Sequence, residues 1–339
     1  MSDPQHIKIV KELNRPGILF SLARVAGSSR VFVGASDAKV YDLDVMAEKP
    51  EPQEMAGHQS YVTGTVLAGN QLVSSAYDGR LIWWDTETHQ AIRSVEAHKR
   101  WIRELVVTPD GSRVVSVADD MVCRVWDVES GGLVHELRGH QEKTPNHFPS
   151  MLYTCAVSPD GDFLATGDRV GHNVIWDLSS GKQVAAVETP TMYTWDPKQR
   201  IHSIGGVRSL AFSPDSKQLA IGGIGKIGNI DHLGVPARLE IFDWQKNERT
   251  HEFSDGKIKG LNERLVFHPE NKWLLAAGGD HNGFYQFFDL AANKSIKHEK
   301  APMHIHDMAF DAEANEIYAV GHGKIVVWQM SATEEAASS

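Results

Sequence analysis

The sequence is poor in cysteine, in basic residues and in long apolar runs, and each shortage excludes a class of protein. Its 339 residues include only two cysteines, Cys123 and Cys155, which have no C-x-x-C spacing and cannot build a disulfide framework. There is no run of about 18 apolar residues, as a membrane-spanning helix would need, and no signal peptide pattern at the start. With 34 basic and 44 acidic residues the net charge is −10, which repels nucleic acid and anionic lipid. We therefore expect a soluble, cytoplasmic protein with neither nucleic acid nor membrane as its partner.

The sequence also lacks the motifs of common enzymes. It has no G-x-S-x-G nucleophile motif, no H-E-x-x-H zinc motif and no Walker A sequence. The segment GGIGKIGN at residues 222–229 is similar to a phosphate loop, but it lacks the G-K-[ST] ending and a following helix, so we interpret it as a plain loop. We predict no cofactor and favour a binding function over catalysis.

A short apolar segment that ends in an aromatic residue and, in six of seven copies, an aspartate recurs along the chain. Examples are KVYD at 39–42, LIWWD at 81–85 and NVIWD at 173–177. The seven copies end at positions 42, 85, 127, 177, 243, 289 and 329, so the gaps are 43, 42, 50, 66, 46 and 40 residues. Alternating stretches such as QLVSSA at 71–76 and Pro-Asp-Gly turns lie between the copies, and both features indicate strands rather than helices.

Seven copies at this spacing resemble the WD40-repeat family. The resemblance implies an all-β, seven-bladed β-propeller of four-stranded antiparallel blades, forming one domain over residues 1–330, with 331–339 as a disordered tail. Each copy would end the third strand of a blade. The resemblance also implies that HIKIVKEL at residues 6–13 supplies the outer strand of the last blade and closes the ring, which removes two exposed sheet edges. A β-sandwich with coincidental aromatic–Asp pairs is the alternative fold.

The resemblance further implies a hydrogen-bonded chain of His, Ser or Thr, Asp and Trp within single blades. In the second repeat the serine is Ser74 or Ser75, and in the fourth repeat Val170 stands where the aspartate is expected. Such side chains satisfy one another's buried polar groups, so we interpret them as structural rather than catalytic. The predicted members are His58, Asp78, Trp84, His98, Asp120, Trp126, His140 and Trp176.

In WD40 relatives, the residues before each first strand lie on one face of the ring, here called the top face, around the central channel. Tyr61 and Trp101 take this position in the second and third repeats, and Arg103 follows closely. Tyr77 and Asp119 precede the turn aspartates of the same repeats and are expected beside them. We therefore predict a surface for a protein or peptide partner; the alternative is that the two rings only cap the adjacent blade.

Three long loops account for the two largest gaps between copies. They span residues 140–151, 188–207 and 222–238, and the resemblance places them on the top face. We predict that side chains of the first two loops either bind the partner or pack on one another. An enzyme or small-ligand binder with a pocket walled by these loops is the alternative function. The side chains concerned are His147, Phe148, Tyr193, Trp195 and Arg200.

One group of histidines offers the alternative of a metal site. His304 and His306 are two residues apart, so strand alternation puts them on one face, and His322 lies at a turn of the same repeat. Three imidazoles can hold Zn²⁺ or Cu²⁺. Because no H-E-x-x-H or cysteine-bearing metal motif accompanies them, no metal is predicted.

Overall fold

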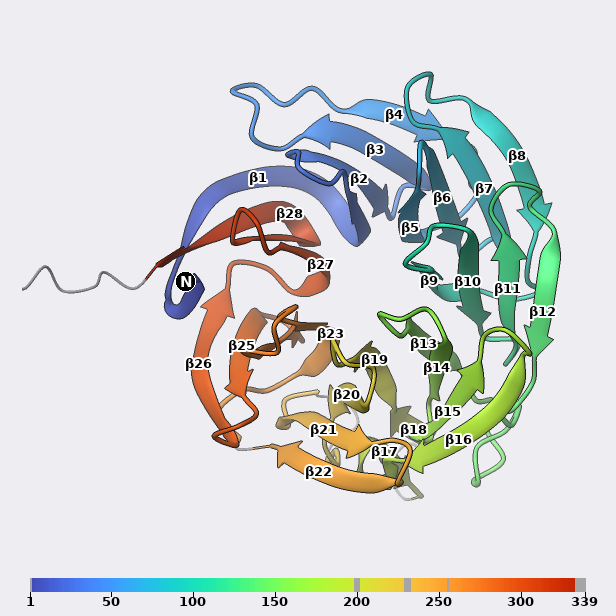
Figure 1. Ribbon diagram of the computed structural model, residues 1–339, viewed down its shortest axis with the longest axis vertical. Coiled ribbons are helices and arrows are strands. Elements are labelled where there is room, and N and C mark those ends of the chain that lie inside the picture. Colours follow the sequence, from blue (N-terminus) through green and yellow to red (C-terminus); the bar gives the residue numbers. More distant parts are fainter. Residues whose placement is uncertain (1, 198–201, 229–232, 255, 333–339) are drawn as a thin grey trace, which may run out of the picture.

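The computed structural model describes residues 2–197, 202–228, 233–254 and 256–332. In these residues the chain forms antiparallel strands joined by short loops, and one 3-10 helix at Pro190–Met192. The sheets stand like blades around a central axis (Figure 1). The all-β propeller of antiparallel blades predicted from the repeats is therefore confirmed. Among the described residues, no helix has the length and apolar character needed to cross a membrane.

Five blades have four strands each, and in each the first strand lies nearest the axis (Figure 1). The first of these blades comprises β5–β8, which are Val62–Ala68, Gln71–Ala76, Arg80–Asp85 and Ala91–Glu96. The next is β9–β12, with Ile102–Val107, Arg113–Ala118, Cys123–Asp127 and Leu133–Leu137. Then come β13–β16, with Leu152–Val157, Phe163–Asp168, His172–Asp177 and Lys182–Glu188. The last two are β19–β22, with Val207–Phe212, Gln218–Ile224, Ala237–Asp243 and Glu248–Phe253, and β23–β26, with Leu261–Phe267, Leu274–Gly279, Gly283–Asp289 and Lys294–Ala301.

The remaining large sheet has six strands in the order β27, β28, β1, β2, β3, β4. The described residues therefore form six blades, and the predicted number of seven is wrong. The first and last repeats share one sheet because β1 is continuous: its residues 7–18 pair with β28 and its residues 19–24 pair with β2. A separate two-stranded sheet is formed by β17 (Tyr193–Asp196) and β18 (His202–Gly205). The strands of the six-stranded sheet are β27 (Ile305–Asp311), β28 (Glu316–Ala332), β1 (Ser2–Arg24), β2 (Arg30–Ala35), β3 (Lys39–Asp44) and β4 (Gln53–Ala56).

The first and last strands of the described chain meet in the six-stranded sheet. β1 runs antiparallel to β28, with Ile7 opposite Met330 and Leu13 opposite Ile325, and Figure 1 shows the two strands side by side. A strand from the start of the chain thus completes the sheet that contains the last repeat. Residues 331 and 332 belong to the end of β28, whereas the rest of the predicted tail, 333–339, lies outside the described residues.

The core lies between neighbouring blades, which cover each other on both faces. The middle strands are consequently buried at nearly every position, as in Arg80–Asp85 and Leu274–Gly279. Trp83 and Trp84 on β7 point to opposite faces of one blade, and both are fully buried. Burial of both faces explains why the repeats contain unbroken apolar runs, and it supplies most of the favourable free energy of folding.

Candidate interaction surface at the mouth of the central channel

A row of aromatic rings lies around the axis where the innermost strands begin. Phe20 of β1 stacks on Tyr61 with ring centroids 5.6 Å apart, Tyr61 lies 5.8 Å from Tyr77, and Tyr77 stacks on Trp101 at 4.6 Å. We call these four residues the aromatic arc. Tyr61 is 46% and Trp101 50% exposed. The structure therefore brings the three predicted rings and Phe20 together in one continuous row across three blades, with Phe20 and Tyr77 partly buried.

Arg103 of β9 contacts two rings of the arc. Its guanidinium donates to both carboxylate oxygens of Asp119 at 2.8 and 2.6 Å and to the Tyr77 hydroxyl at 2.8 Å. It also lies 5.2 Å from the centre of the Trp101 ring. Burial alone would lower the pKa of Arg103, but hydrogen bonding to Asp119 keeps it above its ordinary value. A permanently charged, bidentate side chain thus holds two rings of the arc in place.

A cavity of about 290 Å³ opens beside the arc and forms the mouth of the central channel. Most of its walls come from the same position on each innermost strand, one or two residues after the strand begins. Arg208 lies with its guanidinium 3.8 Å from the centre of the Tyr153 ring. Burial raises the pKa of Tyr153, but Arg208 and two further arginines lower it below its ordinary value. The lining residues are Phe20, Thr63, Tyr77, Arg103, Glu104, Tyr153, Arg208, Glu263, Arg264 and His306.

A charged network that includes Glu104 and Arg264 of this lining crosses the channel. Arg264 of β23 donates to Glu104 of β9 and, at 2.7 Å, to Asp307 of β27. Asp307 also accepts from the Leu22 amide at 2.8 Å, and Glu104 accepts from the Cys155 amide at 2.9 Å. Both carboxylate residues are buried. These three residues, which we call the channel triad, join five different strands, and the sequence analysis did not find them.

The second, third and fourth repeats each contain one network of hydrogen-bonded side chains. In the first, His58 donates from Nδ1 to Asp78 at 3.0 Å, while the hydroxyl of Ser74 lies 2.8 Å from His58 Nε2 and accepts from the Trp84 indole at 2.8 Å. Ser74, not Ser75, is therefore the linking serine. Burial alone would raise the pKa of Asp78, but hydrogen bonds, that from His58 foremost, hold it below its ordinary value.

The other two networks repeat this arrangement. His98 contacts Asp120 at 3.0 Å and Ser116 at 2.8 Å, and Trp126 donates to the same serine at 2.9 Å. The prediction that the network of the fourth repeat lacks an acidic residue is wrong. His140 contacts Asp168 at 2.9 Å and Thr166 at 2.8 Å, and Trp176 donates to that threonine at 2.9 Å. Asp168 is the last residue of β14, so it reaches His140 from the strand end instead of from the turn.

Two of these three networks fall in segments that match a known family. The family model described as WD domain, G-beta repeat matches residues 89–127 and 131–177, which contain all the members of the second and third networks. The chain contains WD40 repeats in these two segments. The structure of its blades and the position of the linking side chains agree with that assignment.

Relatives of this WD40-repeat protein share its repeats over part of their length. Nuclear distribution protein PAC1-2 of Uncinocarpus reesii (strain UAMH 1704) is 29% identical over 174 residues, which cover 47% of this chain and 35% of that protein. Apoptotic protease-activating factor 1 of Rattus norvegicus is 29% identical over 170 residues, covering 50% and 13%. WD repeat and SOCS box-containing protein 1 of Xenopus tropicalis is 32% identical over 109 residues, covering 32% and 24%. The chain spans less than half the length of the curated relatives it matches.

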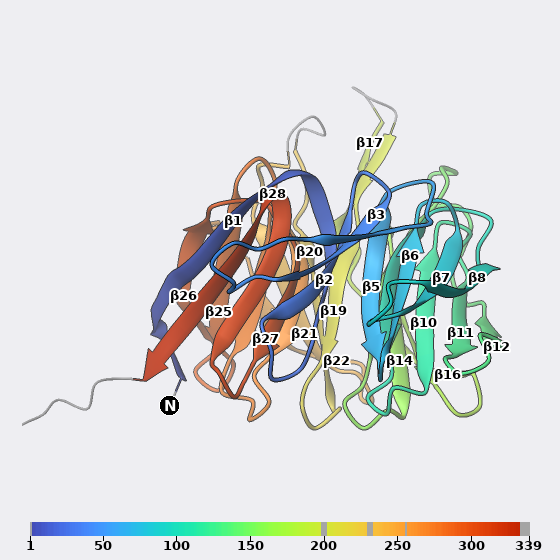
Figure 2. The same ribbon diagram turned by 90° about the horizontal axis from the view of Figure 1, so that it is seen from above.

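The long loops of the propeller pack on one another. Phe148 of the first lies with its ring centroid 5.1 Å from that of Trp195 in the second, and the Tyr193 hydroxyl donates to Asn146 at 2.7 Å. The second and third loops are joined because the Ile227 amide donates to Thr194 at 2.9 Å. The side chains of Phe148, Tyr193 and Trp195 are half-buried. Figure 2 shows β17 extending beyond the body of the propeller. His147 is exposed, and Arg200 lies outside the described residues.

The three candidate metal ligands also come together. One ring nitrogen from each of His304, His306 and His322 lies within 4.8 Å of the others. Burial lowers the pKa of His306 to about 3, and burial together with His304 lowers that of His322. Burial also acts to lower the pKa of His304, but Glu263, whose carboxylate is 3.6 Å away, raises it above the ordinary value. His306 ends the row of rings, 5.2 Å from Phe20.

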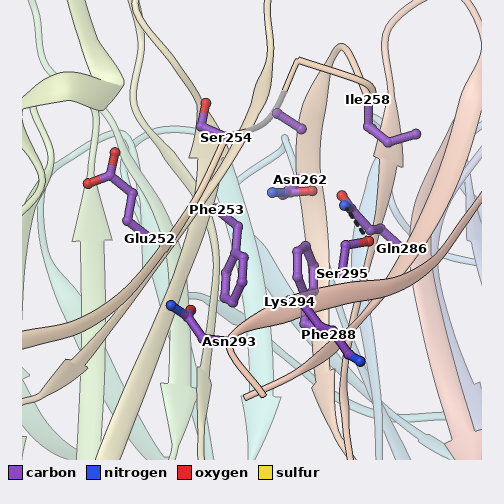
Figure 3. Close-up of a pocket in the computed structure, with 11 residues that line it drawn as sticks. Glu252, Phe253, Ser254, Ile258, Asn262, Gln286, Phe288, Asn293, Lys294 and Ser295 are labelled. Carbon is purple, nitrogen blue, oxygen red and sulfur yellow. Dashed lines mark hydrogen bonds between the residues drawn. The ribbon is translucent and has the colours of Figure 1, made fainter. Parts of the chain in front are cut away.

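A second cavity, of about 440 Å³, lies between the β19–β22 and β23–β26 blades (Figure 3). Its wall is mostly amide, hydroxyl and aromatic, and Gln286 donates to Ser295 at 3.0 Å across it. The carboxylate of Glu252 is paired with Arg238 at 2.9 Å. Lys294 is the other charged residue of its described lining. Only Ala237 of this lining comes from the long loops, so this cavity is not the pocket expected between those loops.

Proposed function

We propose that this WD40-repeat protein is a non-enzymatic scaffold that binds a protein or peptide at the aromatic arc and the channel mouth. The observation that carries the proposal is the continuous row from Phe20 to Trp101, with two rings about half exposed. Tryptophan, tyrosine and arginine dominate binding energy at protein interfaces. The same row lies beside a cavity whose wall carries further arginine and tyrosine side chains.

The fixed geometry of the arc supports the same proposal. Trp101 and Tyr77 are held by stacking and by Arg103, which is itself held by Asp119. A partner that binds to side chains already in place loses less conformational entropy than one that must order them. We include in the proposed surface the half-buried rings of the long loops, Phe148 and Trp195, which pack on each other.

Thiol chemistry supports a proposed location, and charge disfavours two classes of partner. We propose the cytoplasm, because Cys123 and Cys155 are both buried and free, as is usual in reducing compartments. A net charge of −10 disfavours nucleic acid and anionic membranes, so neither is proposed as a partner.

An affinity capture from an extract of the source cells tests the scaffold proposal. Trp101→Ala removes the most exposed ring of the arc, and we expect it to lower recovery of the bound partner at least tenfold, which corresponds to about 1.4 kcal/mol of a hot-spot contact. Leu133→Ala on β12 is the matched control, since Leu133 is an apolar side chain with the same 50% exposure. Circular dichroism would check that both variants fold. Equal recovery by the two variants would contradict the proposal.

A further inference from the structure

The histidine cluster is built by two adjacent strands of the six-stranded sheet. His304 immediately precedes β27, His306 lies within it, and His322 lies on β28. The amide of His322 donates to the carbonyl of His304 at 3.1 Å, so the backbone fixes these two residues side by side. The rings of His304 and His306 stack with centroids 4.5 Å apart, and each lies 5.0 Å from the ring of His322.

We propose that His304, His306 and His322 form a binding site for one divalent transition-metal ion of the zinc class. The proposal does not depend on the scaffold function. Three imidazoles with one further position are a common zinc ligand set, and nitrogen ligands favour zinc, copper, nickel and cobalt over magnesium or calcium.

The hydrogen bonding of His304 leaves a nitrogen free for a metal. Its Nδ1 lies 2.8 Å from the carbonyl oxygen of Asp280, and a carbonyl can only accept, so the proton sits on Nδ1. In the neutral ring Nε2 then carries the lone pair, which is the form that binds a metal ion. A hydrogen bond from the second ring nitrogen to a carbonyl is also what orients most zinc-bound histidines.

Two nitrogens of the cluster are buried without a hydrogen bond. Among the described residues, neither His304 Nε2 nor His306 Nε2 has a hydrogen-bond partner, although His304 is only 8% exposed. A buried polar atom without a partner costs about 1 to 3 kcal/mol, and a metal ion would satisfy both atoms. Glu263 has a carboxylate oxygen 3.6 Å from His304 Nε2, and it is placed to orient that ring or to offer an oxygen ligand.

The geometry needs only a small adjustment to bind. Zn–N bonds of 2.0–2.1 Å in a tetrahedron put ligand nitrogens about 3.3 Å apart, whereas these lie within 4.8 Å. His322 is exposed, so its side chain can close the difference. His306 and Glu263 line the channel mouth, so the open coordination position faces the cavity, where a water molecule or a donor atom of a partner can occupy it.

Metal titration of the purified protein, first freed of metal by a chelator, tests the proposal. We expect calorimetry with ZnCl₂ to show one site per chain with micromolar or tighter affinity. His306→Ala and His322→Ala should each weaken that site at least tenfold, and His298→Ala, an exposed histidine on β26, should leave it unchanged. Glu263→Gln should weaken it by about 10- to 100-fold if Glu263 orients His304.

Cobalt provides a second readout that does not depend on affinity. Co²⁺ bound by three imidazoles in a tetrahedral site should give visible absorption bands in the wild type and in His298→Ala but not in His322→Ala. Because His322 is exposed, its substitution should leave the thermal unfolding of the metal-free chain unchanged. The proposal would be overturned by a wild-type chain that binds no zinc, or by zinc binding that His306→Ala and His322→Ala both leave intact.

Discussion

At the scale of single residues, two adjacent serines of β6 have the same burial but different roles. Ser74 and Ser75 are both completely buried. The Ser74 hydroxyl accepts from the Trp84 indole and lies within hydrogen-bond distance of His58, whereas the Ser75 hydroxyl has no hydrogen-bond partner among the described residues. The pair therefore separates the effect of a hydrogen-bond network from the effect of burying a hydroxyl.

Replacing these serines one at a time should show that difference as stability. Ser74→Ala leaves the Trp84 donor and the His58 acceptor unsatisfied in the core, so we expect a loss of about 2 to 3 kcal/mol in the free energy of unfolding. Ser75→Ala removes a hydroxyl without breaking a bond, and should change stability by less than about 0.5 kcal/mol. Urea unfolding followed by tryptophan fluorescence measures both. Equal losses would mean that the network contributes nothing beyond packing.

Residue types alone could predict most members of these networks but not their exact positions. The sequence contains His140 and Trp176 at the expected places, yet the aspartate is Asp168, eight residues before the tryptophan instead of six. A fixed spacing assumes that the acid always stands in the turn. The end of β14 is equally close to the histidine, and a sequence pattern carries no information about that distance.

At the scale of strands, aligning the repeats selected only part of the lining of the channel mouth. The alignment selected Tyr61 and Trp101, which precede β5 and β9, whereas most of the mouth is lined by the residues two positions further on. Of these residues the sequence analysis named Arg103 but not its counterparts Tyr153 and Arg208. Strand alternation sends these side chains toward the axis. A signal for the remaining residues was present: Arg208, Glu263 and Arg264 are charged residues within otherwise apolar innermost strands, where charges are rare unless they are paired or functional.

The pairing of β1 with β28 makes a prediction about the closing strand. Ile7, Val10 and Leu13 of β1 are partly buried and pack against the cores of this sheet. Each contributes about 1 kcal/mol of apolar burial, so deleting residues 1–13 should cost about 3 kcal/mol or more. The deletion also exposes the edge of β28, which favours association of chains. Lys8→Ala, at an exposed position of the same strand, is the control that should behave as wild type.

Thermal unfolding and size-exclusion chromatography together measure both consequences. We expect the shortened chain to unfold at a lower temperature and to elute partly as larger species. An unchanged midpoint and a single monomer peak would show that the pairing seen in the structure contributes little to stability.

At the scale of the whole molecule, the number of blades was the feature that repeat counting could not settle. Seven aromatic copies were found, and the class of fold followed from them, but a copy marks a strand and not the limits of a sheet. Whether two neighbouring repeats form separate sheets depends on whether the strand between them is interrupted. β1 continues from its pairing with β28 into its pairing with β2, and backbone pairing of this kind has no signature in side-chain spacing.

The channel triad connects opposite sides of the ring, so it should matter for the stability of the ring as a unit. Arg264 is the one cation between the buried carboxylates of Glu104 and Asp307 in this triad. Arg264→Met would leave both carboxylates unpaired, and removing one partner of a buried ion pair typically costs about 3 to 5 kcal/mol. Because Arg264 is 21% exposed at its side chain and solvent screens part of its charge, we expect the lower end, about 3 kcal/mol.

A neutral version of the whole triad separates charge from packing. In the triple variant Glu104→Gln, Arg264→Met, Asp307→Asn, no unpaired charge remains, and the amide side chains can still accept from the Leu22 and Cys155 amides. We therefore expect the triple variant to be more stable than Arg264→Met alone, although it carries two more substitutions. Urea unfolding at neutral pH gives the three free energies. If the triple variant is the least stable, the triad acts through shape complementarity in the channel, and the charges are not what joins the blades.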